Sequence, residues 1–409
     1  MPGWQCRALS ARAVVLPARK LWPERAGAER AHELEPLVKR EITLSSQDIT
    51  QAEIDEVVAV LRSERLSLGP RIPAFEQEFV KRLGVKHAIA CNSGTSGLHM
   101  VWRAMGIGPG DEVITTPFSF IASSNSIMFQ GGKPVFVDID PHTWQIDPAR
   151  IEAAITPRTR ALLPVDVFGV PAEMDAVNAI ARKHNLRVLE DSCEALGATY
   201  RGRWCGLLGE AGVFGFYPNK QITTGEGGMV VTNNDEIAFL CRAYRNQGRD
   251  PTADWLAHAR LGFNYRMNDV QAAIGIHQMR RLDEILAKRD RVAGYYLQRL
   301  RDEPRLSLQR VPEHCKISWF VFVVRLSDDY SAEQRLTIIE RLRAAGVACQ
   351  VYFPAIHLQP FYQEPPLSYR RGMFPITEAL CDRTIALPFH NHLSEADVDY
   401  VVRTLRSLL

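Results

Sequence analysis

The chain of 409 residues is long enough for two or three domains, or for one large domain with an appendage. Hydrophobic residues make up 46% of it and charged residues 23%, which is the balance of a globular protein with a sizeable core. Lysine and arginine (49) exceed aspartate and glutamate (47) by only two, which excludes a broad basic surface for nucleic acid or for a membrane. We therefore expect small-molecule partners.

The eight cysteines are scattered, without a Cys-x-x-Cys pair or a histidine cluster at metal spacing. We therefore expect reduced thiols in the cytoplasm and no metal site. No apolar run is long enough to span a bilayer. Residues 1–23 contain four basic residues and no acidic one, a pattern that can mimic a transit peptide. We expect residues 1–40 to be a disordered extension, or the product of a start codon assigned too far upstream.

From residue 48 onward, helical and strand-like patterns alternate, as in α/β proteins with a mostly parallel sheet. The first is an amphipathic helix over 48–63, capped by Asp48 or Thr50. A short buried strand over 87–91 then turns into a helix at 93–97. Next come expected strands at 112–117, 134–140, 160–169 and 186–191, with helices at 123–130 and 174–185 between them.

In the second half of the chain, the regular alternation of strands and helices gives way to a polar loop and a long helix-rich stretch. Strand-like runs at 213–218 and 228–233 bracket a polar loop, and a helix-rich stretch over 268–300 is long enough to link two domains. Beyond it, the patterns at 318–326, 335–346, 347–353 and 395–409 indicate a smaller α+β unit. The sequence therefore predicts a large domain over 41–283 and a small C-terminal domain over 284–409.

Four features fall at the ends of predicted strands, where ligands collect in open α/β sheets. The run SGTSG at 93–97 joins a strand to a helix, so that its glycines and free N–H groups could hold a phosphate. Such a turn is also commonly just a helix cap. Phe120, just past the next strand, could stack on a flat cofactor, although aromatic residues mostly pack in cores.

The other two features are Asp191, at the end of an apolar strand, and Lys220, in an otherwise uncharged loop. An acid beside a pyridine nitrogen keeps that nitrogen protonated, which makes the ring an electron sink. A partly desolvated lysine becomes nucleophilic and forms Schiff bases. A single aspartate there is usually a cap and a single lysine is usually solvated. Asp191 followed by Lys220, with a possible phosphate-binding turn at 93–97 and Phe120 upstream of both, favours a chemical role for the two residues.

Over roughly residues 42 to 409 the chain resembles the DegT/StrS-type family of sugar aminotransferases, which depend on pyridoxal 5'-phosphate (PLP). The resemblance is carried by LSLGPRIPAFE, NSGTSGLH, GPGDEVITTPFSFIASSNSI, PVFVDID, EDSCEALGA, FYPNKQITTGEGGMVVT, NYRMNDVQAAIG and ALPFHNHLS. It implies an α/β fold of the aspartate-aminotransferase type (fold type I). In that fold, helices flank a mostly parallel seven-stranded sheet in the large domain, and a smaller α+β domain follows.

The same resemblance implies roles for individual residues. Lys220 would hold PLP as a Schiff base, Asp191 would pair with the pyridine nitrogen, and Phe120 would pack on the ring. The cofactor phosphate would be held by the backbone and hydroxyl groups of Thr95 and Ser96.

Family members also bring an asparagine from the neighbouring subunit to the phosphate, which implies a homodimer with shared active sites. Asn264 is the candidate for that residue. Arg266 lies nearby in the sequence as a candidate substrate contact. His357 could touch substrate and could equally pack in the core.

Three positions depart from the commonest family pattern. Glu194 stands where many relatives have glutamine beside the phenolic oxygen of the cofactor, and Leu196 replaces a frequent histidine. Gly215 falls where several relatives carry a phosphate-binding serine. We expect Glu194 to contact the cofactor and the serine contact to be missing.

The resemblance implies transfer of an amino group, from L-glutamate, to a nucleotide-linked 3- or 4-keto-6-deoxyhexose for surface-polysaccharide or natural-product sugars. A lyase is the second reading. The sugar dehydratases of the family replace the lysine with histidine, so Lys220 argues against them, whereas the route to aminobenzoates keeps its lysine and stays open. A non-catalytic regulator is the third reading, and the lack of a basic DNA-binding face counts against it.

Overall fold

The computed structural model describes residues 41–250 and 257–409. These residues belong to one compact unit. The expected division between a large and a small domain at 283/284 stays a prediction. The expectation of a disordered extension concerns residues 1–40, which lie outside the described residues.

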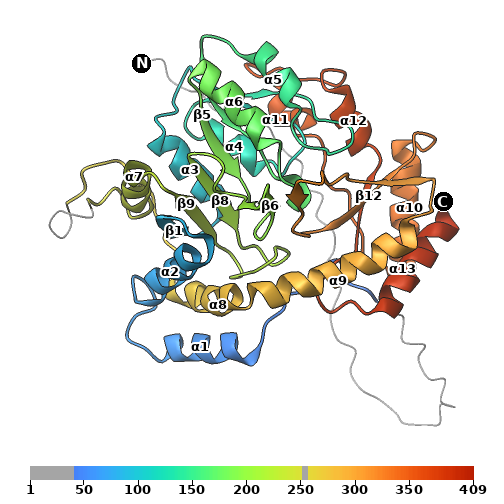
Figure 1. Ribbon diagram of the computed structural model, residues 1–409, viewed down its shortest axis with the longest axis horizontal. Helices are drawn as coiled ribbons and strands as arrows, with labels where there is room; N and C mark the ends of the chain where they lie inside the picture. Colours follow the sequence, from blue (N-terminus) through green and yellow to red (C-terminus); the bar gives the residue numbers. More distant parts are fainter. Residues whose placement is uncertain (1–40, 251–256) are drawn as a thin grey trace, which may run out of the picture. The chain divides into compact units, whose positions relative to one another are not determined.

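The described residues form a seven-stranded sheet in the order β1-β9-β8-β5-β4-β2-β3 (Figure 1). Neighbouring strands from β8 to β3 are parallel, whereas β9 runs antiparallel to both β8 and β1. This confirms the predicted mostly parallel sheet. The strands are β1 (His87–Cys91), β2 (Glu112–Thr115), β3 (Lys133–Phe136), β4 (Thr159–Leu163), β5 (Arg187–Asp191), β8 (Ala211–Gly215) and β9 (Gly228–Thr232).

Helices flank this sheet, and their capping and burial follow the sequence pattern. The first helix begins after Thr50, which is one of the two expected caps. The side chains of Thr50 and Glu53 form a capping box. The helices up to the end of the sheet are α1 (Gln51–Leu61), α2 (Arg71–Leu83), α3 (Gly94–Ala104), α4 (Ala122–Met128), α5 (Pro148–Ala154), α6 (Met174–His184) and α7 (Asp235–Arg245).

The stretch over 268–300 consists of two helices, α8 (Asp269–Arg280) and α9 (Leu282–Leu300), separated at Arg281. Figure 1 shows α9 running from α8, beside the sheet, to α13 in the C-terminal part. One buried face of α9, which includes Val292, Tyr296 and Leu300, packs in a hydrophobic cluster with the C-terminal strands and helices. This helix therefore joins the two parts of the fold.

The C-terminal part contains a three-stranded antiparallel sheet in the order β10-β12-β13. A further small sheet has the strand order β11-β6-β7. The strands are β10 (Leu306–Leu308), β12 (Phe322–Leu326), β13 (Thr384–Leu387), β11 (Cys315–Lys316), β6 (Thr199–Tyr200) and β7 (Arg203–Trp204). The helices are α10 (Ala332–Ala344), α11 (Pro360–Gln363), α12 (Pro375–Cys381) and α13 (Glu395–Leu408).

Several predicted strands are shorter in the structure, among them the runs at 134–140 and 160–169, which end as strands at Phe136 and Leu163. After Leu163 the chain passes into a short 3₁₀ segment, in which Phe168 has a φ of 60°. The run at 318–326 is a strand only from Phe322. The carbonyls before it accept hydrogen bonds from the side chains of Gln221 and Arg289 instead of from a neighbouring strand.

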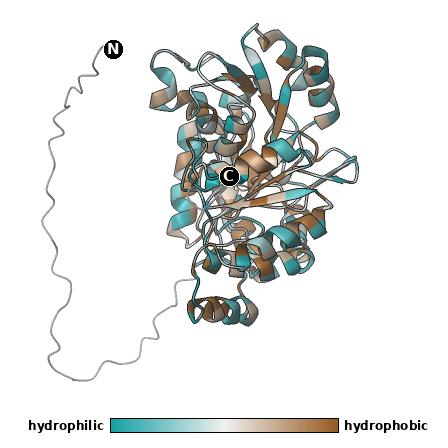
Figure 2. Cartoon of the chain, turned by 90° about the vertical axis from the view of Figure 1, so that its left-hand side faces the viewer, coloured by the Kyte–Doolittle hydropathy of each residue, from teal (hydrophilic) through white to brown (hydrophobic). Residues whose placement is uncertain are grey.

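Apolar colour in Figure 2 lies mainly on the inner strands and helix faces, and hydrophilic colour lies on the outer turns. Helix α1 at the lower edge departs from this, since it leaves Ile54 and Leu61 exposed. Within residues 41–250 and 257–409, every helix falls short of the length and apolar character that a bilayer crossing requires.

Candidate active site

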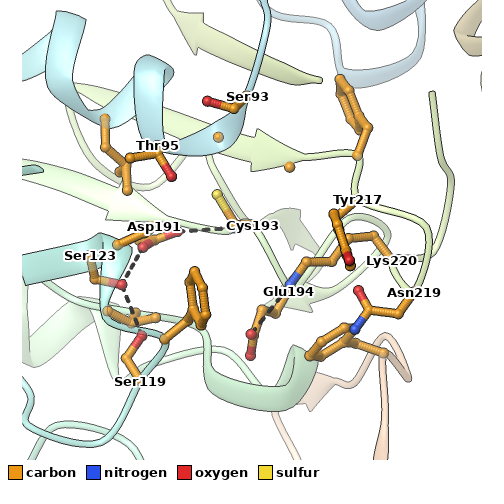
Figure 3. Close-up of a pocket in the computed structure, with 18 of the residues that line it drawn as sticks. Ser93, Thr95, Ser119, Ser123, Asp191, Cys193, Glu194, Tyr217, Asn219 and Lys220 are labelled. Carbon is orange, nitrogen blue, oxygen red and sulfur yellow. Dashed lines mark hydrogen bonds and ion pairs between the residues drawn. The ribbon is translucent and has the colours of Figure 1, made fainter. Parts of the chain in front are cut away.

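A pocket of about 480 Å³ lies where several strands of the large sheet end. Asp191 is the last residue of β5, Gly215 is the last residue of β8, and Ser93 follows β1 by two residues. The carboxyl ends of parallel strands are the usual binding edge of an open α/β sheet. Three of the four features singled out in the sequence therefore face one cavity from strand ends, and Lys220 joins them from the loop between β8 and β9 (Figure 3).

Lys220 points into this pocket with only 14% of its side chain exposed. Its Nζ lies 3.3 Å from Oε1 of Glu194 and 3.8 Å from the centre of the Phe320 ring. Its main-chain carbonyl accepts a hydrogen bond of 2.7 Å from the buried guanidinium of Arg289, on α9. The lysine is therefore held at both its backbone and its amine.

Asp191 is buried, and its carboxylate accepts hydrogen bonds from the Ser123 hydroxyl (2.7 Å) and the Cys193 N–H (3.2 Å). The Ser123 hydroxyl also lies 2.8 Å from that of Ser119, which precedes α4, and Figure 3 shows the three side chains in a row. Among the described residues no ion pair to Asp191 is recorded. Neutral donors thus hold this carboxylate in place and leave its charge without a cationic protein partner.

Helix α3 points its first turn at the pocket. Ser93 caps the helix by accepting a hydrogen bond of 3.1 Å from the Ser96 N–H. The Ser96 hydroxyl lies 2.9 Å from that of Ser93 and does not line the pocket, whereas Thr95 and Gly94 do. The first N–H groups of a helix have no acceptor within it, and they favour anions. The start of α3 is therefore suited to a phosphate, with Thr95 rather than the Ser96 hydroxyl facing it.

Phe120 lines the pocket and is 58% exposed. Its ring centre lies 6.4 Å from that of Phe353, which also lines the pocket. Phe120 is therefore placed on the pocket wall, as the prediction of a stacking role requires, and not in the core.

Glu194 also lines the pocket, and both its oxygens have partners. Oε2 accepts a hydrogen bond of 2.9 Å from the Phe168 N–H, while Oε1 faces Lys220. Burial raises the pKa of Glu194, and the nearby charge of Lys220 opposes that rise.

Besides Ser96, three predicted residues lie outside this pocket. Asn264 is exposed and forms a backbone bridge with Asn246. Arg266 donates from Nη1 to the side-chain oxygens of Asn246 (2.9 Å) and Gln247 (2.6 Å). Neither lines the pocket of its own chain, so their expected roles across a subunit interface stay predictions.

His357 is fully buried, with its Nε2 3.0 Å from Oε1 of Glu378 and its ring against Phe374. Burial lowers its pKa. It does not line the pocket, so of the two roles left open for it the structure favours packing.

Several pocket residues were not found from the sequence. Ser119 precedes α4 and Ser123 lies in its first turn, and no motif in the sequence pairs the two serines. Phe320 and Tyr352 come from the C-terminal part, at least 100 residues away from Asp191 and Lys220, and no local pattern marks them.

The pocket lies within the range matched by a known family. The model of the DegT/DnrJ/EryC1/StrS aminotransferase family matches residues 47–406. The GDP-perosamine synthase of Caulobacter vibrioides is 44% identical over 347 residues, which cover 84% of this chain and 91% of that protein.

Two solved structures extend the comparison to the fold. PseC of Helicobacter pylori, an aminotransferase involved in the biosynthesis of pseudoaminic acid, is 30% identical with a TM-score of 0.86. The match covers 90% of this chain and 99% of PseC. A protein of Streptococcus pneumoniae, solved in a PLP form, is 27% identical with a TM-score of 0.86 over 90% of this chain and 98% of its own.

Proposed function

This chain belongs to the DegT/DnrJ/EryC1/StrS aminotransferase family, and from that premise we propose that it moves the amino group of L-glutamate onto a nucleotide-linked keto-deoxysugar. It is a PLP-dependent aminotransferase of a family that acts on sugars. The observation that carries the proposal is that a largely buried lysine amine, that of Lys220, and a buried carboxylate, that of Asp191, line one pocket beside a helix N-terminus.

The residues present fit PLP. The pocket volume falls within the range of about 300 to 1,000 Å³ that cofactor and ligand sites usually have. The Asp191 carboxylate, which lacks a cationic partner among the described residues, suits a protonated pyridine nitrogen. The first N–H groups of α3 and the Thr95 side chain would hold the phosphate, Phe120 would cover the ring, and Lys220 would be the covalent anchor.

When bound, PLP supplies a ring that withdraws electrons from the carbon beside the transferred nitrogen. The chain's own residues supply the rest. Asp191, fixed by Ser123 and by the Cys193 N–H, keeps a proton at the ring nitrogen. Lys220 would hold the cofactor covalently, and its amine, when free, would be placed to give and take the proton at the reacting carbon, so one side chain would serve as anchor and as general acid and base.

The nucleotide-linked sugar is proposed from the relatives. The Caulobacter relative is named for GDP-perosamine, and PseC for the biosynthesis of pseudoaminic acid. Both names support a role in making amino-deoxysugars for polysaccharides or natural products, and we place this role in the cytoplasm as part of the proposal.

We further propose a homodimer in which Asn264 of one subunit reaches the phosphate site of the other. Asn264 is exposed and does not line its own pocket, which supports a role across an interface. Exposed apolar side chains near the pocket and this loop, those of Phe120, Tyr217 and Leu261, also suit a covered surface.

The test is product analysis with purified protein, PLP, L-glutamate and a panel of 3- and 4-keto nucleotide sugars. We expect one amino sugar nucleotide to form, with one 2-oxoglutarate for each. A dehydrated sugar without consumption of glutamate would identify a lyase, and an aminobenzoate formed from a cyclic acid would identify the other branch of the family. The absence of any turnover across the panel and with such acids would favour a non-catalytic role.

A further inference from the structure

Glu194 is a buried acid in direct contact with the lysine that the proposed function makes the covalent anchor. Its Oε1 lies 3.3 Å from Nζ of Lys220, and the two side chains are 6% and 14% exposed. Figure 3 shows both pointing toward each other across one end of the pocket.

The surroundings fix the carboxyl group without neutralising it. Its second oxygen accepts a hydrogen bond from the N–H of Phe168. Phe168 has a φ of 60°, which lies in the left-handed region that residues with side chains rarely adopt. The carbonyl of Glu194 accepts a hydrogen bond of 2.6 Å from the buried amide of Gln221, the residue after Lys220. Strained backbone of this kind persists where the surrounding structure holds it, often at functional sites.

The pair has two ways to avoid an uncompensated buried charge. While the Lys220 amine is an ammonium, an ionised Glu194 balances it. When the Lys220 nitrogen is neutral, an ionised carboxylate in this position has lost its partner, and burial favours the protonated acid. The proton affinity of Glu194 is therefore coupled to the state of Lys220, and the coupling is reciprocal.

We propose that Glu194 is the proton store of Lys220, ionised while Lys220 is an ammonium and protonated when the Lys220 nitrogen is neutral. The exchange is balanced, since Lys220–NH₃⁺ and Glu194–COO⁻ become Lys220–NH₂ and Glu194–COOH. Only the neutral amine is a nucleophile. The store lets Lys220 become neutral, and later regain its proton, through a side chain that it already contacts. This role rests on the proposed function of Lys220.

Other titratable groups face the pair and have to be considered. On its own segment they are Asp191, whose charge raises the pKa of Glu194, and Cys193, whose thiol pKa burial raises. Opposite lie Tyr217 and Tyr352, and burial, with Glu194 as a further cause, raises the pKa of Tyr352 to about 12. Both Cys193 and Tyr352 thus stay protonated at neutral pH, and Glu194 is the acid whose carboxyl oxygen contacts the Lys220 amine.

The first test measures the proton affinity of Lys220 in the full chain freed of PLP. The rate of acylation of Lys220 is followed by mass spectrometry across pH in wild type and in Glu194→Gln. Removing an opposite charge at this distance is expected to lower the midpoint of the labelling profile by about one to three pH units. Glu226→Gln is the matched control, because Glu226 is an exposed acid that lines the same pocket without a recorded contact to Lys220.

The second test measures Glu194 itself, in Lys220→Met, by the infrared band of a protonated carboxyl group at neutral pH. We expect this band in Lys220→Met and its loss in the double variant Lys220→Met/Glu194→Gln. Near-ultraviolet circular dichroism checks the fold of each variant, and the second test stands even where Glu194→Gln alone folds poorly. A midpoint that Glu194→Gln leaves in place, or identical infrared spectra for the single and double variants, would overturn the inference. Neither test uses PLP, so the outcome of both tests can be told apart from a failure of the proposed aminotransferase function.

Discussion

At the scale of single residues, the pocket contains a buried carboxylate, that of Asp191, which is available to pair with a ligand. Asp191 is buried and held only by neutral donors, Ser123 and the Cys193 N–H. Hydrogen bonds to an ionised acceptor are stronger than those between neutral groups. Ser123 therefore orients the carboxylate without cancelling the charge that a pyridine nitrogen needs.

Replacing Ser123 with alanine tests this role. Hydrogen bonds to charged groups contribute about 1.5 to 3 kcal/mol, so we expect Ser123→Ala to lower kcat/KM for the amino donor by roughly ten- to a hundredfold. Ser124→Ala is the control, since the Ser124 hydroxyl points to Tyr362 at 2.8 Å and away from Asp191. Equal steady-state kinetics for the two variants would show that Ser123 does not act through Asp191.

At the scale of elements, strand β5 ends against a buried cluster of Asp166, Glu190 and Cys205, whose candidate ligand atoms lie within 4.8 Å of one another. The Asp166 N–H donates to the Asp191 carbonyl (3.0 Å), and the Asp166 carboxylate accepts from the Ser192 hydroxyl (2.7 Å). Burial raises the pKa of Asp166 to about 6, with the charge of Asp191 as a further cause, and burial together with the charge of Asp166 raises the pKa of Glu190 well above its usual value. The folded protein therefore keeps a proton here that the unfolded chain gives up.

This proton makes stability depend on pH. Because the pKa of Glu190 is raised on folding, the folded chain binds more protons than the unfolded chain above the unfolded value of 4.5. The free energy of unfolding should then fall by about 1.4 kcal/mol per pH unit as pH rises from there toward the folded pKa. Glu190→Gln should remove most of this slope, as measured by urea denaturation at several pH values. An unchanged slope in the variant would place the proton elsewhere.

The elements themselves show what sequence patterns can and cannot predict. The strand at 87–91 and the helix starting after Thr50 match the prediction, because apolar spacing and capping are local properties. The strand expected at 318–326 starts only at Phe322, since long-range hydrogen bonds from Arg289 and Gln221 capture the carbonyls before it. The local pattern of apolar residues in a sequence does not show which distant residues will form such hydrogen bonds.

The same distinction holds for the site. Lys220, Asp191, Thr95 and Phe120 were predicted from motifs and do meet in one pocket. The Ser96 hydroxyl turns to Ser93, and His357 packs against Glu378, because each finds a partner that the sequence does not reveal.

At the scale of the whole molecule, the pocket gathers distant parts of the chain. Lys220 comes from the loop between β8 and β9, Asp191 from β5, and Phe320 and Tyr352 from the C-terminal part. Helix α9 ties these parts together, since Arg289 on it binds the carbonyls of both Lys220 and Phe320. In the proposed dimer, the partner subunit would add the last contact.

Shared sites can be tested by complementation. Lys220→Ala and Asn264→Ala are each expected to be nearly inactive alone. In a co-expressed mixture, each heterodimer of a two-fold dimer has one site with both residues intact, so about a quarter of the wild-type activity should return. Sedimentation should show a dimer throughout. A mixture no more active than its parts would argue that Asn264 serves its own subunit.

The most direct measurement is the visible absorbance of the purified protein with PLP, for wild type and Lys220→Ala, before and after L-glutamate is added. We predict that wild type shows the band of lysine-bound cofactor, that L-glutamate converts it to the pyridoxamine form, and that Lys220→Ala shows neither the band nor a covalent adduct. A wild type that binds no PLP, or a Lys220→Ala variant that holds PLP covalently as well as wild type does, would contradict the assignment of Lys220.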